Sequence, residues 1–178
     1  MTVQEAAERL KLDPLDTVCE ILRRARSRVS AVFFHMCEEN LLRIYSWPFV
    51  CVGSDSSARS LTGPMAQGKP HPRTFGAFGR FFGEYVFRKK IMPLAEAIAR
   101  VTSFPAERFG LRDRGVLRRG AFADIVVFDA KRYRDTATYD DPFSLTAGVR
   151  HLLINGTPVL RDNHETGTRP GRVLRHGG

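Results

Sequence analysis

The chain has 178 residues, 43% of them hydrophobic and 26% charged, a composition typical of a folded core and not of a disordered segment. Its 28 basic and 19 acidic residues give a net charge of +9, but the basic residues are scattered and accompany no known nucleic-acid-binding motif, so we expect no nucleic-acid partner. Because no apolar run is long enough to span a membrane and no signal peptide is evident, we expect a cytoplasmic protein with no membrane partner.

The first third of the chain is predicted to alternate helices with strands, the order typical of parallel α/β units. Helices are expected at residues 3–12, 14–26 and 36–48, and strands at residues 28–34 and 49–53. Asp13 is suited to cap the second helix, and Pro14 suits its first turn. The third helix is expected to end at Pro48, because proline cannot continue a helix.

The second of these strands is apolar throughout and is followed by a lone carboxylate, Asp55. A continuous apolar run is typical of a strand that is buried on both faces. Turn chemistry at the end of the strand is one explanation of Asp55. Catalysis is the other, because active sites of parallel α/β folds lie at the carboxyl ends of their strands.

The middle of the chain contains a long segment rich in Gly, Pro and Ser, at residues 56–79. Loops of this length in compact domains are usually functional. Helices are expected next, at residues 81–89, 94–101 and 103–111, the last closed by Gly110. Residues 114–129 then contain a β-prone run, and residues 149–162 read as two strands joined across Asn155-Gly156, a strong hairpin signal.

The three cysteines, Cys19, Cys37 and Cys51, are widely spaced and form neither a disulfide framework nor a C-x-x-C pair. We expect them to be small buried residues in a reducing compartment. No two of the five histidines are spaced as H-x-H, and no H-E-x-x-H occurs.

Four stretches occur in the order of one known family: VGSDSSA (52–58), GKPHPRTFGAFGRFFGEYV (68–86), LAEAIARVTSFPAERFGLRDRGVLRRGAFADIVVFD (94–129) and HLLINGTPVLRDNHETGTRPGRVLR (151–175). They resemble the C-terminal portion of the N-acyl-D-amino-acid deacylases (D-aminoacylases), which belong to the metal-dependent amidohydrolase superfamily. The pieces ADIVVFD and INGTPV are general to the superfamily. GKPHPRTFG and HETGTRPGRVLR are specific to the deacylases.

The resemblance implies an α/β fold, in which the last strands and helices of a TIM-like barrel are followed by part of a small β-sandwich domain. Residues 1–111 would form the barrel part and residues 112–178 the sandwich part with an extended tail. The implied activity is hydrolysis of the amide bond of N-acyl-D-amino acids, which gives a carboxylate and a D-amino acid.

The resemblance also implies roles for three residues. Asp55 matches the family's acid at the end of the eighth strand, which accepts a proton from a metal-activated water and passes it to the departing amine. Arg73 would pair with the carboxylate of the substrate, although it could instead anchor its loop. His71 would shape this loop or contact substrate. Ser56 stands where the family commonly has Gly and adds a side chain beside the site.

Zinc is expected for the full enzyme, but the principal metal ligands of the family are absent from this chain, which offers Asp55 as at most an outer contact. We therefore expect activity only together with an N-terminal half of the enzyme or a related subunit, and an inactive isolated chain that associates with itself. The alternative is a non-catalytic remnant or interaction module that docks onto a related subunit.

Overall fold

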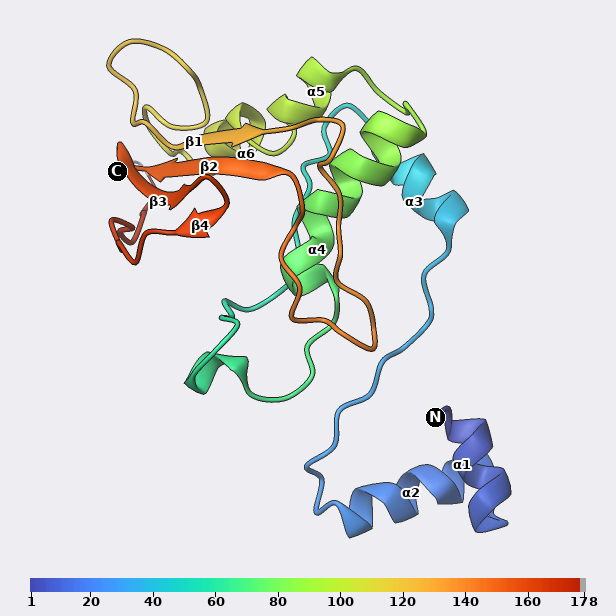
Figure 1. Cartoon of the computed structure of the whole chain (residues 1–178). Helices are drawn as coiled ribbons and strands as arrows, with labels where there is room; N and C mark the ends of the chain where they lie inside the picture. The colour runs from blue at the N-terminus through green and yellow to red at the C-terminus, as the bar shows by residue number, and fades with distance from the viewer. Residues whose placement is uncertain (177–178) are drawn as a thin grey trace. The chain divides into compact units, whose positions relative to one another are not determined.

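A computed structural model describes residues 1–176, which fall into two compact units (Figure 1). The first unit ends at Met36, and the second begins at Cys37. None of the helices formed by residues 1–176 is long and apolar enough to cross a lipid bilayer.

The first unit contains two helices, α1 (Val3–Leu10) and α2 (Pro14–Arg24). Both are slightly shorter than predicted. The cap of α2 is confirmed, because Asp13 Oδ1 accepts hydrogen bonds from the backbone N–H groups of Leu15 and Asp16 at 2.8 and 3.3 Å. The predicted strand at residues 28–34 is wrong. This segment makes no β ladder with any part of the described chain, and its side chains are exposed.

The second unit contains five helices and the short 3-10 turn η1 among its described residues. They are α3 (Glu38–Tyr45), η1 (Pro64–Ala66), α4 (Arg73–Arg80), η2 (Phe81–Arg88), α5 (Leu94–Ala99) and α6 (Ser103–Arg108). The strand predicted at residues 49–53 is also wrong, since its one backbone hydrogen bond to a distant segment runs from Val52 N–H to Arg100 O at 3.2 Å. A strand requires a neighbouring strand to satisfy its backbone groups, and neither predicted barrel strand has one among residues 1–176.

Helix α4 continues without a break into η2, which is a π-helix. The wider winding is visible at its end, where the Lys89 N–H donates to the carbonyl five residues earlier, that of Glu84, at 2.9 Å. The predicted loop at residues 56–79 is therefore too long, because α4 begins at Arg73. Arg73 lies in the first turn of a helix and not on a loop.

Helices α4 and η2 together form one helical column. Three glycines, Gly76, Gly79 and Gly83, lie on one face of it. A Cβ atom on Gly79 would lie 2.8 Å from the backbone nitrogen of Asp135, and one on Gly83 would lie 2.9 Å from the carbonyl oxygen of Tyr133. Only glycine allows so close an approach. The glycines therefore allow the loop between β1 and β2, residues 129–148, to pack closely against the column, and this loop runs beside α4 (Figure 1).

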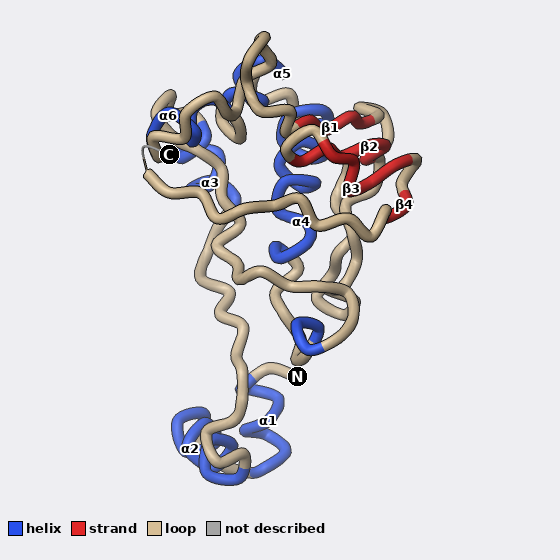
Figure 2. Tube along the Cα trace, turned by 90° about the vertical axis from the view of Figure 1, so that its left-hand side faces the viewer, coloured by secondary structure: helices blue, strands red, loops and turns tan. Residues whose placement is uncertain are grey.

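The strands form one antiparallel sheet in the order β1-β2-β3-β4 (Figure 2): β1 (Ile125–Phe128), β2 (Val149–Ile154), β3 (Thr157–Arg161) and β4 (His164–Glu165). The predicted hairpin is confirmed. Asn155 and Gly156 both have positive φ, 50° and 79°, as a two-residue turn between twisted strands requires. Of the β-prone run at residues 114–129, only β1 is a strand.

Aromatic contacts join the sheet to the helical column. The ring centroid of Phe82 lies 5.7 Å from that of Tyr133, which lies 4.9 Å from that of Phe128. Tyr45 of α3 packs on the other side, with its ring 5.3 Å from that of Phe81. The buried core consists of Phe81, Phe82, Tyr85, Val86, Met92 and Ala97. Residues on both sides of position 111 thus pack together, and the fold is a mixed arrangement of helices and one sheet.

Candidate functional site

Asp55 follows residues 49–53, the predicted strand, and adopts a left-handed backbone conformation, with φ at 47°. Aspartate tolerates this region better than most side chains, because its short polar group can bond locally. The side chain of Asp55 is 89% exposed. The carboxylate is thus presented to the surface on a sharp local turn.

Arg73 brings its guanidinium to this carboxylate, with 2.9 Å between Arg73 Nη2 and Asp55 Oδ2. A second contact joins the next residues of the same two segments, since Ser56 Oγ lies 2.8 Å from Thr74 Oγ1. The extra side chain at position 56 therefore ties the Asp55 turn to the first turn of α4. The structure places Asp55 and Arg73 together, 18 residues apart in sequence.

His71 lies immediately before α4 and makes a hydrogen bond with each of its ring nitrogens. Nδ1 lies 3.1 Å from the backbone nitrogen of Arg73, and Nε2 lies 3.1 Å from the hydroxyl oxygen of Tyr139. A backbone N–H can only donate, so Nδ1 is the acceptor and the ring proton of the neutral imidazole resides on Nε2. Burial, and then the positive charge of Arg73, lower the pKa of His71. The imidazole is therefore held neutral.

Tyr139 is the residue of this site that the sequence did not reveal. It lies in the β1–β2 loop, 68 positions after His71, and its ring meets the imidazole edge to face with 5.1 Å between centroids. The same loop is fastened to α4 by Thr146, whose hydroxyl donates to Phe75 O at 3.1 Å. The spacing of Gly76, Gly79 and Gly83 was the available signal, because it indicates that another segment packs closely on this helix.

Lys69, close to His71 in sequence, is exposed. The expectation of buried cysteines is wrong, since Cys19 and Cys37 are exposed and Cys51 is half-buried.

The residues present do not form a zinc site. Within residues 1–176 no three His, Cys, Asp or Glu side chains gather closely enough to hold a metal ion. The carboxylate of Asp55 faces a guanidinium instead of a further ligand. Catalytic zinc usually requires three protein ligands, so this part of the chain cannot supply a zinc site by itself.

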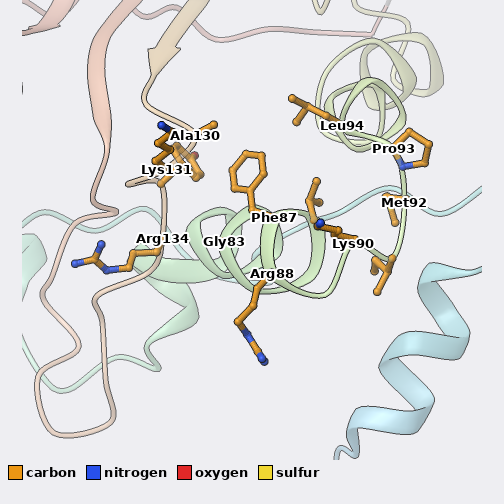
Figure 3. A pocket seen from close by; sticks show the side chains of 13 residues that line it. Gly83, Phe87, Arg88, Lys90, Met92, Pro93, Leu94, Ala130, Lys131 and Arg134 are labelled. Atoms are coloured by element: carbon orange, nitrogen blue, oxygen red, sulfur yellow. The ribbon is translucent and has the colours of Figure 1, made fainter.

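A separate hollow of about 970 Å³ lies at the other end of the helical column, between η2, the start of α5 and residues 130–134 (Figure 3). Its lining is mainly apolar, and its charged lining residues are the bases Arg88, Lys90, Lys131 and Arg134. None of its lining residues is a carboxylate or a histidine that could take a proton from water at neutral pH. Asp55, His71 and Arg73 do not line it. The group around Asp55 is therefore the better candidate for chemistry.

Comparison with known proteins gives consistent matches. Residues 50–160 match the amidohydrolase family. The chain is 40% identical over 159 residues to an N-acyl-D-glutamate deacylase of Alcaligenes xylosoxydans xylosoxydans, which covers 88% of this chain and 31% of that protein. A D-aminoacylase of the same organism is 39% identical over 144 residues, 81% of this chain and 28% of that protein.

Solved structures agree with these matches. An N-acyl-D-glutamate deacylase from Bordetella bronchiseptica, complexed with zinc and a phosphonate inhibitor, superimposes with a TM-score of 0.79 at 37% identity. A D-aminoacylase described as defining a novel subset of amidohydrolases gives a TM-score of 0.81 at 34% identity. Each match covers 97% of this chain and 34% of the other. The chain thus spans about a third of the length of these relatives.

Proposed function

The chain belongs to the amidohydrolase family, and from that premise we propose that it is part of an enzyme that hydrolyses the amide bond of N-acyl-D-amino acids. The products are a carboxylate and a D-amino acid. The observation that carries this proposal is the pairing of Asp55 with Arg73, because it brings a proton acceptor and a carboxylate-binding group to one place.

In this proposal Asp55 handles the proton. Its carboxylate accepts a proton from the water whose oxygen attacks the acyl carbon, and the same proton goes to the amine nitrogen as the C–N bond breaks. The exposure of Asp55 supports this role, since both substrate and water can reach it.

Arg73 has the task of recognising the substrate. Its planar guanidinium suits the two oxygens of the carboxylate of an N-acyl-D-amino acid. Its present partner is a carboxylate of the chain itself, which supports an affinity for such groups. Substrate binding would exchange one carboxylate for the other and release Asp55 for proton transfer.

The full activity is proposed to need a further part of the enzyme, as this chain spans about a third of its relatives. Zinc, which accompanies the Bordetella bronchiseptica relative, would be held by residues outside this chain. The exposed aromatic residues Trp47 and Phe49 support a role as a contact surface for that part.

Complementation tests this proposal. The chain would be co-expressed with the N-terminal two-thirds of the Alcaligenes N-acyl-D-glutamate deacylase, and release of free D-glutamate from N-acetyl-D-glutamate would be measured in the presence of zinc. We expect activity that falls at least about 100-fold with Asp55→Ala, since general acid–base groups contribute on that order. Asp113→Ala, in a distant exposed ion pair, serves as the control.

Two outcomes would overturn parts of the proposal. Activity that survives Asp55→Ala would remove the catalytic role of that residue. A stable complex that shows no hydrolysis with any N-acyl-D-amino acid would favour the alternative, an interaction module that docks on a related subunit.

A further inference from the structure

The β1–β2 loop reaches the candidate site from a part of the chain that is far away in sequence. It is fixed along the glycine face of the helical column, and the bridge between Arg134 and Ala147 closes its base. At its tip, Thr138 and Asp141 bond each other: the Thr138 N–H donates to Asp141 O, and the Asp141 N–H donates to Thr138 Oγ1, each at 2.9 Å. Tyr139 therefore projects from a braced turn.

His71 connects this turn to α4. The residue lies between Pro70 and Pro72, whose rings restrict the backbone on both sides. With its backbone restricted, its ring bonds Tyr139 through Nε2 and the Arg73 N–H through Nδ1. The Tyr139 hydroxyl, the imidazole and the backbone of Arg73 thus form one continuous chain of hydrogen bonds.

We infer that Tyr139 is a positioning residue that acts through His71 to hold Arg73 in place for the carboxylate of the substrate. The role of Arg73 rests on the function proposed above, whereas the coupling of Tyr139 to Arg73 rests on the geometry alone. Without the Tyr139 hydroxyl, the Nε2–H of the imidazole loses its acceptor, and the ring loses the contact that fixes its orientation. The ring can then turn about its side-chain bonds, and Nδ1 ceases to be a constant acceptor for the Arg73 N–H.

This arrangement makes the sheet part of the chain contribute to substrate recognition. The β1–β2 loop carries no group that the proposed reaction needs, but its Tyr139 hydroxyl holds the orientation of the His71 ring. The side chain of Arg73 starts from the first turn of α4, so an error in that turn displaces the guanidinium from its target.

The test uses the full chain with Tyr139→Phe, which removes one oxygen and keeps the ring. Tyr133→Phe is the matched control, because it lies on the same loop and packs against Phe82 and not His71. The side-chain 15N signals of His71 and the backbone amide signal of Arg73 are recorded in the ligand-free chain. Titration with N-acetyl-D-glutamate then reports carboxylate binding.

We expect Tyr139→Phe to shift the His71 Nε2 signal, because Nε2–H loses its acceptor, and to move the His71 Nδ1 and Arg73 amide signals, because the ring loses its fixed orientation. Loss of one hydrogen bond predicts affinity for the probe lower by about 2- to 10-fold. Tyr133→Phe should leave the His71 signals and the affinity unchanged. His71 and Arg73 signals that stay at their wild-type positions in Tyr139→Phe would overturn the inference.

Arg73→Gln separates the inference from the proposed function. If this variant binds the probe as well as the wild type does, or if the wild type does not bind it, the role of Arg73 in recognition is wrong. The His71 and Arg73 signals of Tyr139→Phe still decide the coupling in either case, because they are measured without ligand.

Discussion

The guanidinium of Arg73 and the carboxylate of Asp55 form an ion pair with 2.9 Å between Nη2 and Oδ2. The two residues belong to different segments, and each is proposed to serve the same substrate. While the pair exists, Arg73 is not available to a carboxylate of the substrate. The ion pair therefore competes with substrate binding.

This competition predicts that Asp55→Asn strengthens carboxylate binding. Removing the charge of Asp55 makes Arg73 available to the probe. Because an exposed ion pair contributes about 0.2–1 kcal/mol, we expect the affinity for the probe to rise by roughly 1.5- to 5-fold. The measurement is an NMR titration of the full chain with N-acetyl-D-glutamate. Asp113→Asn, which disrupts the exposed pair with Arg118, should bind like the wild type. Weaker binding by Asp55→Asn would contradict the competition.

His71 is expected to titrate below the ordinary histidine value of 6.5, because burial and then the charge of Arg73 disfavour the protonated ring. The unfolded chain takes up this proton more readily. The contribution of the neutral His71 ring to the free energy of unfolding is therefore fully present above about pH 6.5. It is lost as the pH falls toward the lower pKa that His71 has in the folded state.

An NMR titration of the His71 ring checks this expectation. The Tyr139 hydroxyl contacts the ring, the charge of Arg73 acts on it from two residues away, and Asp55 pairs with that charge. Arg73→Gln should move the midpoint back toward 6.5 without reaching it, since burial remains. A wild-type midpoint at or above 6.5 would show that the ring is not held neutral.

Gly79→Ala is expected to destabilise the fold by about 1–3 kcal/mol, as overpacking in a tight contact does. The added Cβ would lie 2.7 Å from Thr146 Oγ1 and 2.8 Å from the backbone nitrogen of Asp135. This cost exceeds the roughly 1 kcal/mol that alanine gains over glycine in a helix. Urea unfolding measures the difference. Gly171→Ala, in open space, should be near neutral, and equal effects at both positions would contradict the close packing.

Arg114→Met is expected to destabilise the sheet region by about 2–4 kcal/mol, because it leaves the partner carboxylate of a mostly buried pair uncompensated. The Arg114 side chain is 9% exposed, pairs with Asp124, donates to Asn155 Oδ1 at 2.7 Å and lies over the ring of Phe122. Thermal unfolding measures the loss. Arg118→Met, in an exposed pair, should change stability by less than about 0.5 kcal/mol.

The isolated chain is expected to associate with itself through its exposed aromatic surface. Within the second unit, Trp47 and Phe49 are 53% and 60% exposed, and their rings lie 5.5 Å apart. Light scattering after size-exclusion chromatography measures the mass. Replacing both residues with serine should shift the chain toward a monomer. A monodisperse wild-type monomer would show that these side chains are not an association surface.

Local signals in the sequence were reliable guides to local structure. The Asp13 cap and the Asn155-Gly156 turn were predicted because each depends on residues only a few positions apart. The helix boundaries were less certain, and the start of α4 at Arg73 was missed because residues 68–72 contain glycine and prolines that resemble a loop.

The strands predicted at residues 28–34 and 49–53 failed for a different reason. Their composition favours β structure, but a strand exists only where another strand satisfies its backbone groups. No such neighbour occurs for them among residues 1–176, so neither segment forms a ladder.

The sequence by itself determined the family, the hairpin, the helix caps and the choice of Asp55, His71 and Arg73 as candidates. Only the tertiary structure decided that Arg73 pairs with Asp55 and that Tyr139 bonds His71. The physical reason is the range of the interactions. Caps and tight turns depend on neighbours along the chain. The Arg73–Asp55 pair instead joins two separate segments, and the Tyr139–His71 bond depends on a loop that packs along three glycines of a distant helical segment.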